Sequence, residues 1–237
     1  SRIALSLLYL FHDLSDEARE KMFPVRSVLS AISNAKDSLI SPAEFEAQQG
    51  NDFRMQKIAV LYKEYQKRLK SADAMDFDDM ITETVNLFQK NPELLKYYQN
   101  KFKYIMVDEY QDTNHAQYVL VNLLSKAHEN ICVVGDDDQS IYRFRGATIE
   151  NILNFEDDYD SAKTIRLEQN YRSKANILNA ANAIISNNKG RKGKTLWTDK
   201  GEGDLINVHT ATDEREEAKY IANKILENVR NGGKFSQ

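Results

Sequence analysis

The sequence predicts an α/β protein in which a helical region comes first and a parallel sheet with flanking helices follows. Before Lys101, apolar residues recur at helical spacing and strand signals are few. After Lys101, short β-rich runs alternate with helical patterns, which is typical of parallel strands joined by crossover helices. Polar residues follow each of the first three runs, where open parallel sheets bind their ligands.

The helical region carries two helix starts and one long amphipathic pattern. Ser41-Pro42-Ala43-Glu44 has the serine, proline and glutamate of a capping box, and Asn91-Pro92 opens another helix in a similar way. Residues 53–69 place apolar side chains on one helical face. Residues 3–11 are apolar but far shorter than the roughly 20 residues of a membrane span, so we interpret them as a helix face.

Alternating patterns fill the rest of the chain. We expect strands at residues 103–107, 130–134, 163–167 and 205–209, and helices at residues 117–126, 148–155, 173–186 and 213–229. Cys132 lies inside the second apolar run, so we expect a buried, inert thiol.

Composition narrows the class of protein. A length of 237 residues is enough for one large or two modest domains. A single cysteine excludes a disulfide-stapled exported domain and favours the reducing cytoplasm. The net charge of −4 excludes a polybasic coat, so any contact with nucleic acid must come from a local groove.

The first β-rich run leads directly into two adjacent acids, Asp108 and Glu109. At the carboxyl end of a strand, Asp108 could hold the magnesium ion of a bound nucleotide. Glu109 could then orient or deprotonate a water aimed at the γ-phosphate. The alternative is a pair of solvated acids at a helix start.

The second run ends in acids, an amide, aromatic residues and arginines. Gln139 could sense a γ-phosphate, while Tyr142 and Phe144 could stack on unpaired bases. Arg143 and Arg145 would add contacts to phosphates. The alternative places both rings in the core and the acids in a solvated turn.

The third run ends in Tyr171 and Arg172. Tyr171 could stack on an adenine ring, and Arg172 could reach the β- and γ-phosphates as an arginine finger. The alternative for this pair alone is an ordinary loop before a helix.

Together these segments resemble the superfamily 1A DNA helicases of the UvrD, PcrA and Rep type. Tyr110-Gln111-Asp112-Thr113-Asn114 after the acid pair resembles motif II, residues 135–147 resemble motif III, and residues 167–173 resemble motif IV. Residues 74–80 and 190–199 resemble the family segments before motif II and after motif IV. Phe144 stands where many relatives have tryptophan, and Asp137 stands where alanine is common.

The resemblance implies ATP and Mg²⁺ as cofactors and single-stranded DNA and duplex junctions as partners. It implies part of a RecA-like P-loop NTPase sheet, with residues 1–73 as a 1B-like helical subdomain, 74–171 as a partial 1A-like motor and 172–237 as the beginning of a 2A-like motor. Gln139 would couple the γ-phosphate to DNA, and Tyr142, Phe144 and Arg145 would contact DNA. The predicted activity is ATP-driven movement along single-stranded DNA, 3′ to 5′, with duplex unwinding.

The phosphate-binding pattern Gly-x-x-x-x-Gly-Lys-Ser/Thr is absent from these 237 residues, and Gly193-Lys194-Thr195 lacks its first glycine. We therefore expect an internal fragment of a helicase, inactive as an ATPase by itself. A sheet lacking its first strand exposes an edge, which predicts a dimer of the fragment or marginal stability. Two alternatives remain open: a stand-alone module that binds single-stranded DNA or a protein, and the motor of a helicase-nuclease of the RecB or AddA kind.

Overall fold

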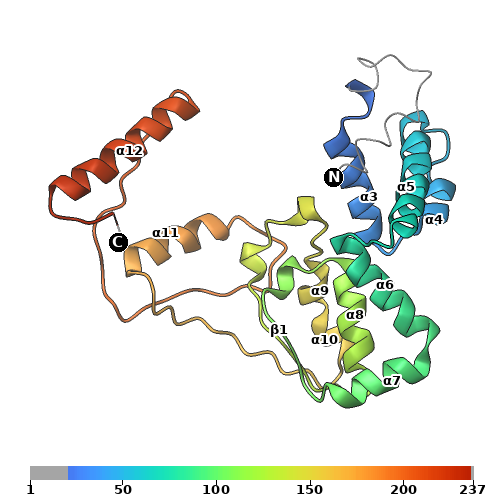
Figure 1. Ribbon diagram of the computed structural model, residues 1–237. Helices are drawn as coiled ribbons and strands as arrows, with labels where there is room; N and C mark the ends of the chain where they lie inside the picture. The colour runs from blue at the N-terminus through green and yellow to red at the C-terminus, as the bar shows by residue number, and fades with distance from the viewer. Residues whose placement is uncertain (1–20, 236–237) are drawn as a thin grey trace. The chain divides into compact units, whose positions relative to one another are not determined.

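The computed structural model describes residues 21–235, apart from the side chain of Arg145 (Figure 1). The chain divides into two compact units: Ser1–Ile165 with Gly190–Lys192, and Arg166–Lys189 with Gly193–Gln237. The helix face expected at residues 3–11 lies outside the described residues. Between residues 21 and 235, no helix combines the length and the apolar character that crossing a membrane requires.

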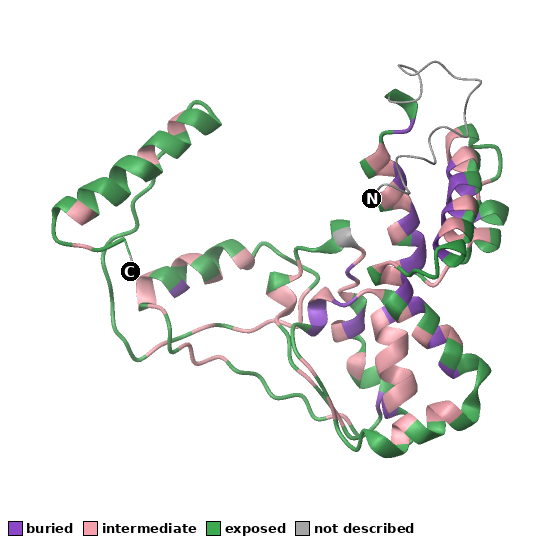
Figure 2. Ribbon diagram, in the orientation of Figure 1, coloured by how far each residue is buried: buried purple, intermediate pink, exposed green. Residues whose placement is uncertain are grey.

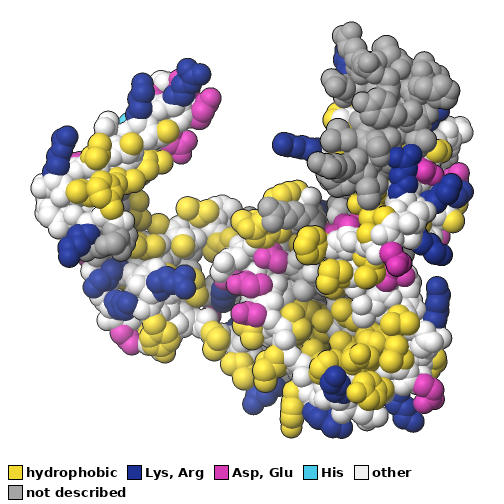
Figure 3. Space-filling model, in the orientation of Figure 1, with side chains coloured by type: hydrophobic (Ala, Val, Ile, Leu, Met, Phe, Trp, Pro, Cys, Tyr) yellow, Lys and Arg dark blue, Asp and Glu magenta, His cyan; other side chains and the backbone are white. Residues whose placement is uncertain are grey.

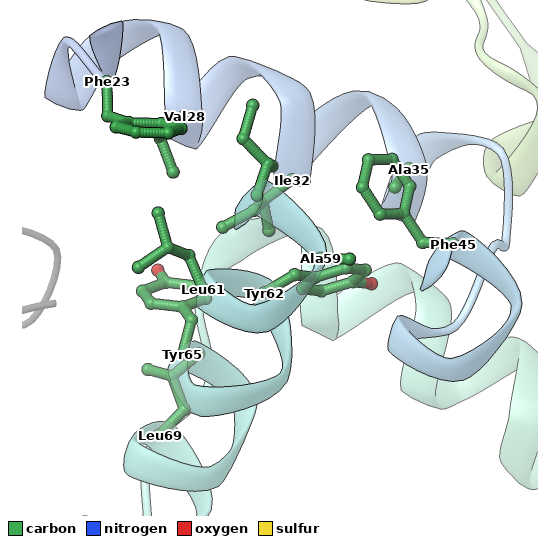
Figure 4. Packing of buried hydrophobic residues seen from close by; sticks show 11 residues of the cluster. Phe23, Val28, Ile32, Ala35, Phe45, Ala59, Leu61, Tyr62, Tyr65 and Leu69 are labelled. Atoms are coloured by element: carbon green, nitrogen blue, oxygen red, sulfur yellow. The ribbon is translucent and has the colours of Figure 1, made fainter. Parts of the chain in front are cut away.

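In the described part of the first unit, three helices precede the rest: α3 (Val25–Asp37), α4 (Pro42–Gln48) and α5 (Phe53–Ser71). The predicted capping box is confirmed at the start of α4, where the backbone N–H of Glu44 donates to Ser41 Oγ and that of Ser41 donates to Glu44 Oε2. The amphipathic pattern is confirmed as α5, whose apolar face packs on α3 and α4 (Figure 4). This cluster is the hydrophobic core of the helical region, and its members are Phe23, Val28, Ile32, Ala35, Phe45, Ile58, Ala59, Leu61, Tyr62, Tyr65 and Leu69.

Two further helices, α6 (Phe77–Lys90) and α7 (Pro92–Lys101), connect this core to the sheet. A second capping box starts α6, because Asp76 and Asp79 bond to each other's backbone N–H groups. The ammonium group of Lys36, at the end of α3, lies 2.6 Å from an Asp76 oxygen and 2.7 Å from an Asp79 oxygen. A buried ion pair therefore fixes α6 against α3.

Within residues 21–235 the sheet is parallel and has two strands, β1 (Ile105–Val107) and β2 (Ile131–Val133), joined through α8 (His115–Ser125). The α/β class is thus confirmed in its coarse form, a helix-rich protein with a small parallel sheet. Met106 pairs with Cys132 in register, and its side chain is 80% exposed. The expectation of a buried Cys132 was wrong: alternate strand residues face opposite sides, and Cys132 lies on the exposed side.

Two predicted strands are absent from the described residues. Residues 163–167 and 205–209 form no regular secondary structure, with Leu167 76% and Val208 89% exposed. These segments have the composition of strands, but a strand also needs a partner for its N–H and C=O groups. Near the first segment, the described residues form only an isolated bridge between Gln169 and Trp197.

The remaining helices match the predicted segments. They are α9 (Glu150–Leu153) and α10 (Phe155–Asp158) in the first unit, and α11 (Ala175–Ile185) and α12 (Glu214–Arg230) in the second. Most of α12 is exposed, including the apolar stripe along it (Figure 2). The second unit therefore has little core of its own among the described residues.

Candidate functional site

The acid pair after β1 is exposed and held in a specific backbone conformation. Glu109 adopts the left-handed region, with φ 51° and ψ 41°, and starts the short helix η2 (Tyr110–Asp112). Its N–H donates to the Oδ1 atom of Asp108 at 2.9 Å. Left-handed backbone costs a residue with a Cβ atom on the order of 1–3 kcal/mol, and such strain clusters at functional sites.

A buried glutamine links the ends of the two strands. The side-chain amide of Gln111 donates to Glu109 Oε2 at 2.8 Å, and its Oε1 atom accepts the N–H of Asp136 at 2.9 Å. Gln111 is 1% exposed. Gly135 makes this bridge possible, because a Cβ atom there would lie 2.5 Å from Gln111 Oε1. The segments after β1 and β2 thus form one structure in which Gln111 orients Glu109.

Sequence reasoning did not single out Gln111. The signal that could have found it is an amide two residues after an acid pair at a strand end, because an amide can donate to one partner and accept from another.

The turn after β2 carries Gln139 at its end. Asp136 caps the short helix η3 (Asp137–Gln139) by accepting the N–H of Asp138 at 3.0 Å. The other oxygen of Asp136 accepts from the side-chain amide of Gln139 at 2.7 Å. Gln139 is exposed, so its amide is held by a neighbour but accessible to a ligand.

The aromatic pair follows on a second short helix, η4 (Arg143–Arg145). Phe144 is 72% and Tyr142 38% exposed, and their ring centroids are 5.9 Å apart. The alternative that both rings lie in the core is therefore wrong. Arg143 is exposed as well, whereas the side chain of Arg145 lies outside the described structure.

Phe144 also lines an open pocket of about 690 Å³ bounded by α3, the start of α6 and η4. Its wall includes apolar, hydroxyl, amide and carboxylate groups, from Leu29, Ser30, Ile32, Ser33, Asn34, Asp37, Tyr65, Asp76, Phe77, Asp78, Asn114 and Phe144. Phe77 is 88% exposed and was missed by sequence reasoning. No pattern in the sequence marks Phe77, because the exposure of a residue at a helix start depends on which other elements pack there.

Asp37, which lines this pocket, also contacts Asn114 before α8 and lies next to Gly146 after η4. Its Oδ1 atom accepts from the side-chain amide of Asn114 at 2.6 Å. A Cβ atom at Gly146, which has φ 82°, would lie 3.0 Å from Asp37 Oδ2. Burial, and then the charge of Asp78, raise the pKa of Asp37 to about 6.

Tyr171 and Arg172 belong to the second unit, where both are exposed. Asn170 shapes their turn by accepting the backbone N–H of Arg172 at 2.9 Å and that of Ser173 at 2.7 Å. The hydroxyl of Tyr171 donates to Gln169 Oε1 at 2.7 Å. Their approach to Asp108 and Glu109 stays a prediction.

Comparison with known proteins covers almost the whole chain. Residues 5–160 match the UvrD/REP helicase N-terminal domain, and residues 165–237 match the UvrD-like helicase C-terminal domain. ATP-dependent DNA helicase PcrA of Staphylococcus epidermidis is 53% identical over 223 residues, which are 94% of this chain and 30% of that protein. ATP-dependent DNA helicase PcrA of Staphylococcus aureus is 53% identical over 215 residues, 91% of this chain and 29% of that protein. The chain thus spans under a third of these relatives.

Proposed function

The chain belongs to the UvrD/REP helicase family, and from this premise we propose that it is part of an ATP-dependent DNA helicase. The whole protein would couple ATP hydrolysis to 3′ to 5′ movement along single-stranded DNA and to duplex unwinding. The observation that carries the proposal is the Gln111 bridge, which joins the exposed acid pair after β1 to the turn that leads into the exposed aromatic pair. Coupling between a nucleotide site and a base-stacking surface can be carried by such a chain of hydrogen bonds.

The donor set at the end of β1 fits a magnesium nucleotide, because exposed carboxylate oxygens are the protein ligands that Mg²⁺ prefers. Bound Mg²⁺ and ATP would supply the transferable phosphoryl group and neutralise part of its charge. Asp108 would hold the ion. Glu109, oriented by Gln111, would position a water and accept its proton.

Three further side chains would complete the nucleotide site. Gln139 would contact the γ-phosphate, Arg172 would place its guanidinium against the β- and γ-phosphates, and Tyr171 would stack on adenine. We base these roles on the resemblance of their segments to the family motifs and on the exposure of the three side chains. The motor would span two RecA-like domains, with residues 1–73, 74–171 and 172–237 as the 1B-like, 1A-like and 2A-like parts.

For DNA, we propose that Tyr142 and Phe144 stack on bases while Arg143 and Arg145 contact phosphates. Phe77 lines the same pocket as Phe144 and would add a second aromatic wall for a base. Stacking contributes about 1–3 kcal/mol per base and tolerates any sequence. The net charge of −4 fits this mode, because binding would depend on a local surface.

The test is the affinity of the chain for a fluorescent oligothymidine. Phe144→Ala and Tyr142→Ala should each weaken binding about 5- to 150-fold through lost stacking. Phe53→Ala is the matched control, since Phe53 is 54% exposed on α5 and does not line the pocket. Equal affinities for wild type and both variants would remove the stacking role.

The same chain should show negligible ATP hydrolysis. The pattern Gly-x-x-x-x-Gly-Lys-Ser/Thr supplies backbone amides and a lysine that cradle the phosphates, and these 237 residues do not contain it. DNA-stimulated ATP turnover by the purified chain would contradict this proposal.

Self-association of the chain is a separate proposal. Met106 and Cys132 lie on an uncovered face of the sheet, and hydrophobic side chains also gather over α6 and α7 (Figure 3). Uncovered sheets and apolar patches recruit other chains. Sedimentation should reveal dimers at micromolar concentration, and a monomer throughout would refute the proposal.

A further inference from the structure

The side chain of Arg191 binds the acidic turn after β2, which consists of Asp136, Asp137 and Asp138. Gly190–Lys192 packs as part of the first unit, although its neighbours in sequence belong to the second. Arg191 donates from Nε to Asp138 Oδ1 at 2.6 Å and from Nη2 to Asp138 Oδ2 at 2.7 Å. The two side chains are only 15% and 13% exposed. This is the two-pronged pairing that gives arginine its geometric specificity.

Lys192, the next residue, makes two further contacts with acidic residues of the first unit. The backbone N–H of Lys192 donates to Asp137 Oδ2 at 2.7 Å, and its ammonium group lies 2.9 Å from Glu156 Oε2. Carboxylate oxygens of Asp136, Asp137 and Asp138 lie within 4.8 Å of one another. Like charges this close repel, so the guanidinium and the amide of residues 191 and 192 offset a repulsion that would open the turn.

The acidic turn is connected to the residues that we propose contact the γ-phosphate and DNA. Asp138 is the central residue of η3, and Gln139 ends it. Asp136 both caps η3 and holds the Gln139 amide, and it meets Gln111 through its N–H. Tyr142 follows three residues after Gln139. A change in the orientation of η3 would therefore move the amide and the aromatic pair together.

We propose that Arg191 is a positioning residue for the acidic turn, which it holds through Asp138 in the conformation that presents Gln139, Tyr142 and Phe144. The inference rests on the proposed function, because presentation to DNA is what the positioning serves. Lysine would keep the charge at this position but cannot make both bonds in one plane. An experiment with Arg191→Lys can therefore separate the effect of the positive charge from the effect of the two-bond geometry.

The binding experiment uses the chain and a single-stranded oligonucleotide containing 2-aminopurine, whose fluorescence falls when it stacks on an aromatic ring. Arg191→Met and Arg191→Lys should both lose at least half of the quenching at saturating DNA. Lys192→Met is the matched control: it removes one positive charge and the ion pair with Glu156, which lies in α10 and outside the acidic turn, but it keeps the Arg191 contact and the backbone N–H of residue 192. It should keep the wild-type quenching while weakening affinity only through charge.

Asp138→Asn provides a second route to the same contact without a change in volume. Combining it with Arg191→Met should cost no more quenching than either change alone, because both remove one interaction. Full quenching with Arg191→Lys, or equal losses with Arg191→Met and Lys192→Met, would overturn the positioning role.

Amide hydrogen exchange without DNA keeps this inference distinct from the proposed function. Arg191→Met should speed exchange across residues 136–144 at least tenfold, with Lys192→Met like the wild type. If the wild-type chain failed to bind DNA, the proposed function would fall, and exchange would then decide whether Arg191 holds the turn. Unchanged exchange in Arg191→Met would overturn the inference whatever the DNA result.

Discussion

Lys36 carries a buried charge, and water cannot replace its interactions if the side chain is removed. It is 2% exposed and pairs with Asp76 and with Asp79, whose side chain is 4% exposed. Lys36→Met would leave two carboxylates near α3 with neutral hydrogen-bond donors but without their cation, so we expect the free energy of unfolding to fall by about 3–5 kcal/mol. Urea unfolding followed by far-UV circular dichroism measures this loss.

The control for Lys36 uses the same substitution at an exposed pair. Lys63 lies 3.2 Å from Glu46, with side chains 64% and 51% exposed. Lys63→Met should cost less than about 1 kcal/mol, because exposed ion pairs contribute little. Similar losses for both variants would show that burial does not govern the Lys36 pair.

Asp37 predicts a dependence of stability on pH. Its pKa is raised from 3.8 to about 6, mainly by burial and then by Asp78. The folded state therefore holds a proton that the unfolded state has released, so this group's contribution is full below about pH 4 and is lost as pH rises through about 6. The melting temperature of the wild type, measured relative to Asp37→Asn, should fall between these pH values and then stay level. A difference independent of pH would contradict the shifted pKa.

At the scale of elements, the sequence predicted the features that depend on local residues, but it did not predict which strands would pair. The Ser41–Glu44 capping box and the apolar face of α5 depend on residues a few positions apart, and both are confirmed. Residues 163–167 have the composition of a strand, but strand formation depends on a distant partner. Cys132 was misjudged for the same reason, since which face of a sheet is covered depends on elements elsewhere in the chain.

The candidate site also contains residues that the sequence could indicate and residues that only the structure revealed. The sequence could indicate Asp108, Glu109 and Gln139, because each residue type suggests its chemistry, and their roles remain predictions. Gln111 and Arg191 act through contacts 25 and 53 residues away. Both contacts are tertiary. An amide two residues after an acid pair could have indicated Gln111 as a bridging residue, whereas neither composition nor spacing points to the contact between Arg191 and Asp138.

Gly135 tests whether the two strand ends act as one element. A Cβ atom there would meet Gln111 Oε1 at 2.5 Å and the Tyr110 nitrogen at 3.2 Å, so Gly135→Ala must displace the Gln111 bridge. We expect a loss of about 1–3 kcal/mol in stability and a matching loss of 2-aminopurine quenching. Gly190→Ala is the control, since a Cβ atom there meets nothing within 4 Å. Wild-type behaviour of Gly135→Ala would show that the bridge is dispensable.

At the scale of the whole molecule, the two units differ in how much core they hold. The cluster around α3, α4 and α5 lies entirely in the first unit. Leu178 is the one buried hydrophobic side chain among the described residues of the second. Because burial of apolar surface is the main favourable contribution to folding, the second unit should be the less stable.

Trp197 makes this difference measurable, because it is the only tryptophan in the sequence and belongs to the second unit. In urea, its fluorescence should change at a lower concentration than the far-UV circular dichroism, which reports mainly the helices of the first unit. Two separate transitions are what independent domains give. Lys36→Met should lower the circular dichroism midpoint and leave the Trp197 midpoint unchanged, since Lys36 stabilises only the first unit. Coincident transitions that both move with Lys36→Met would mean that the units fold as one.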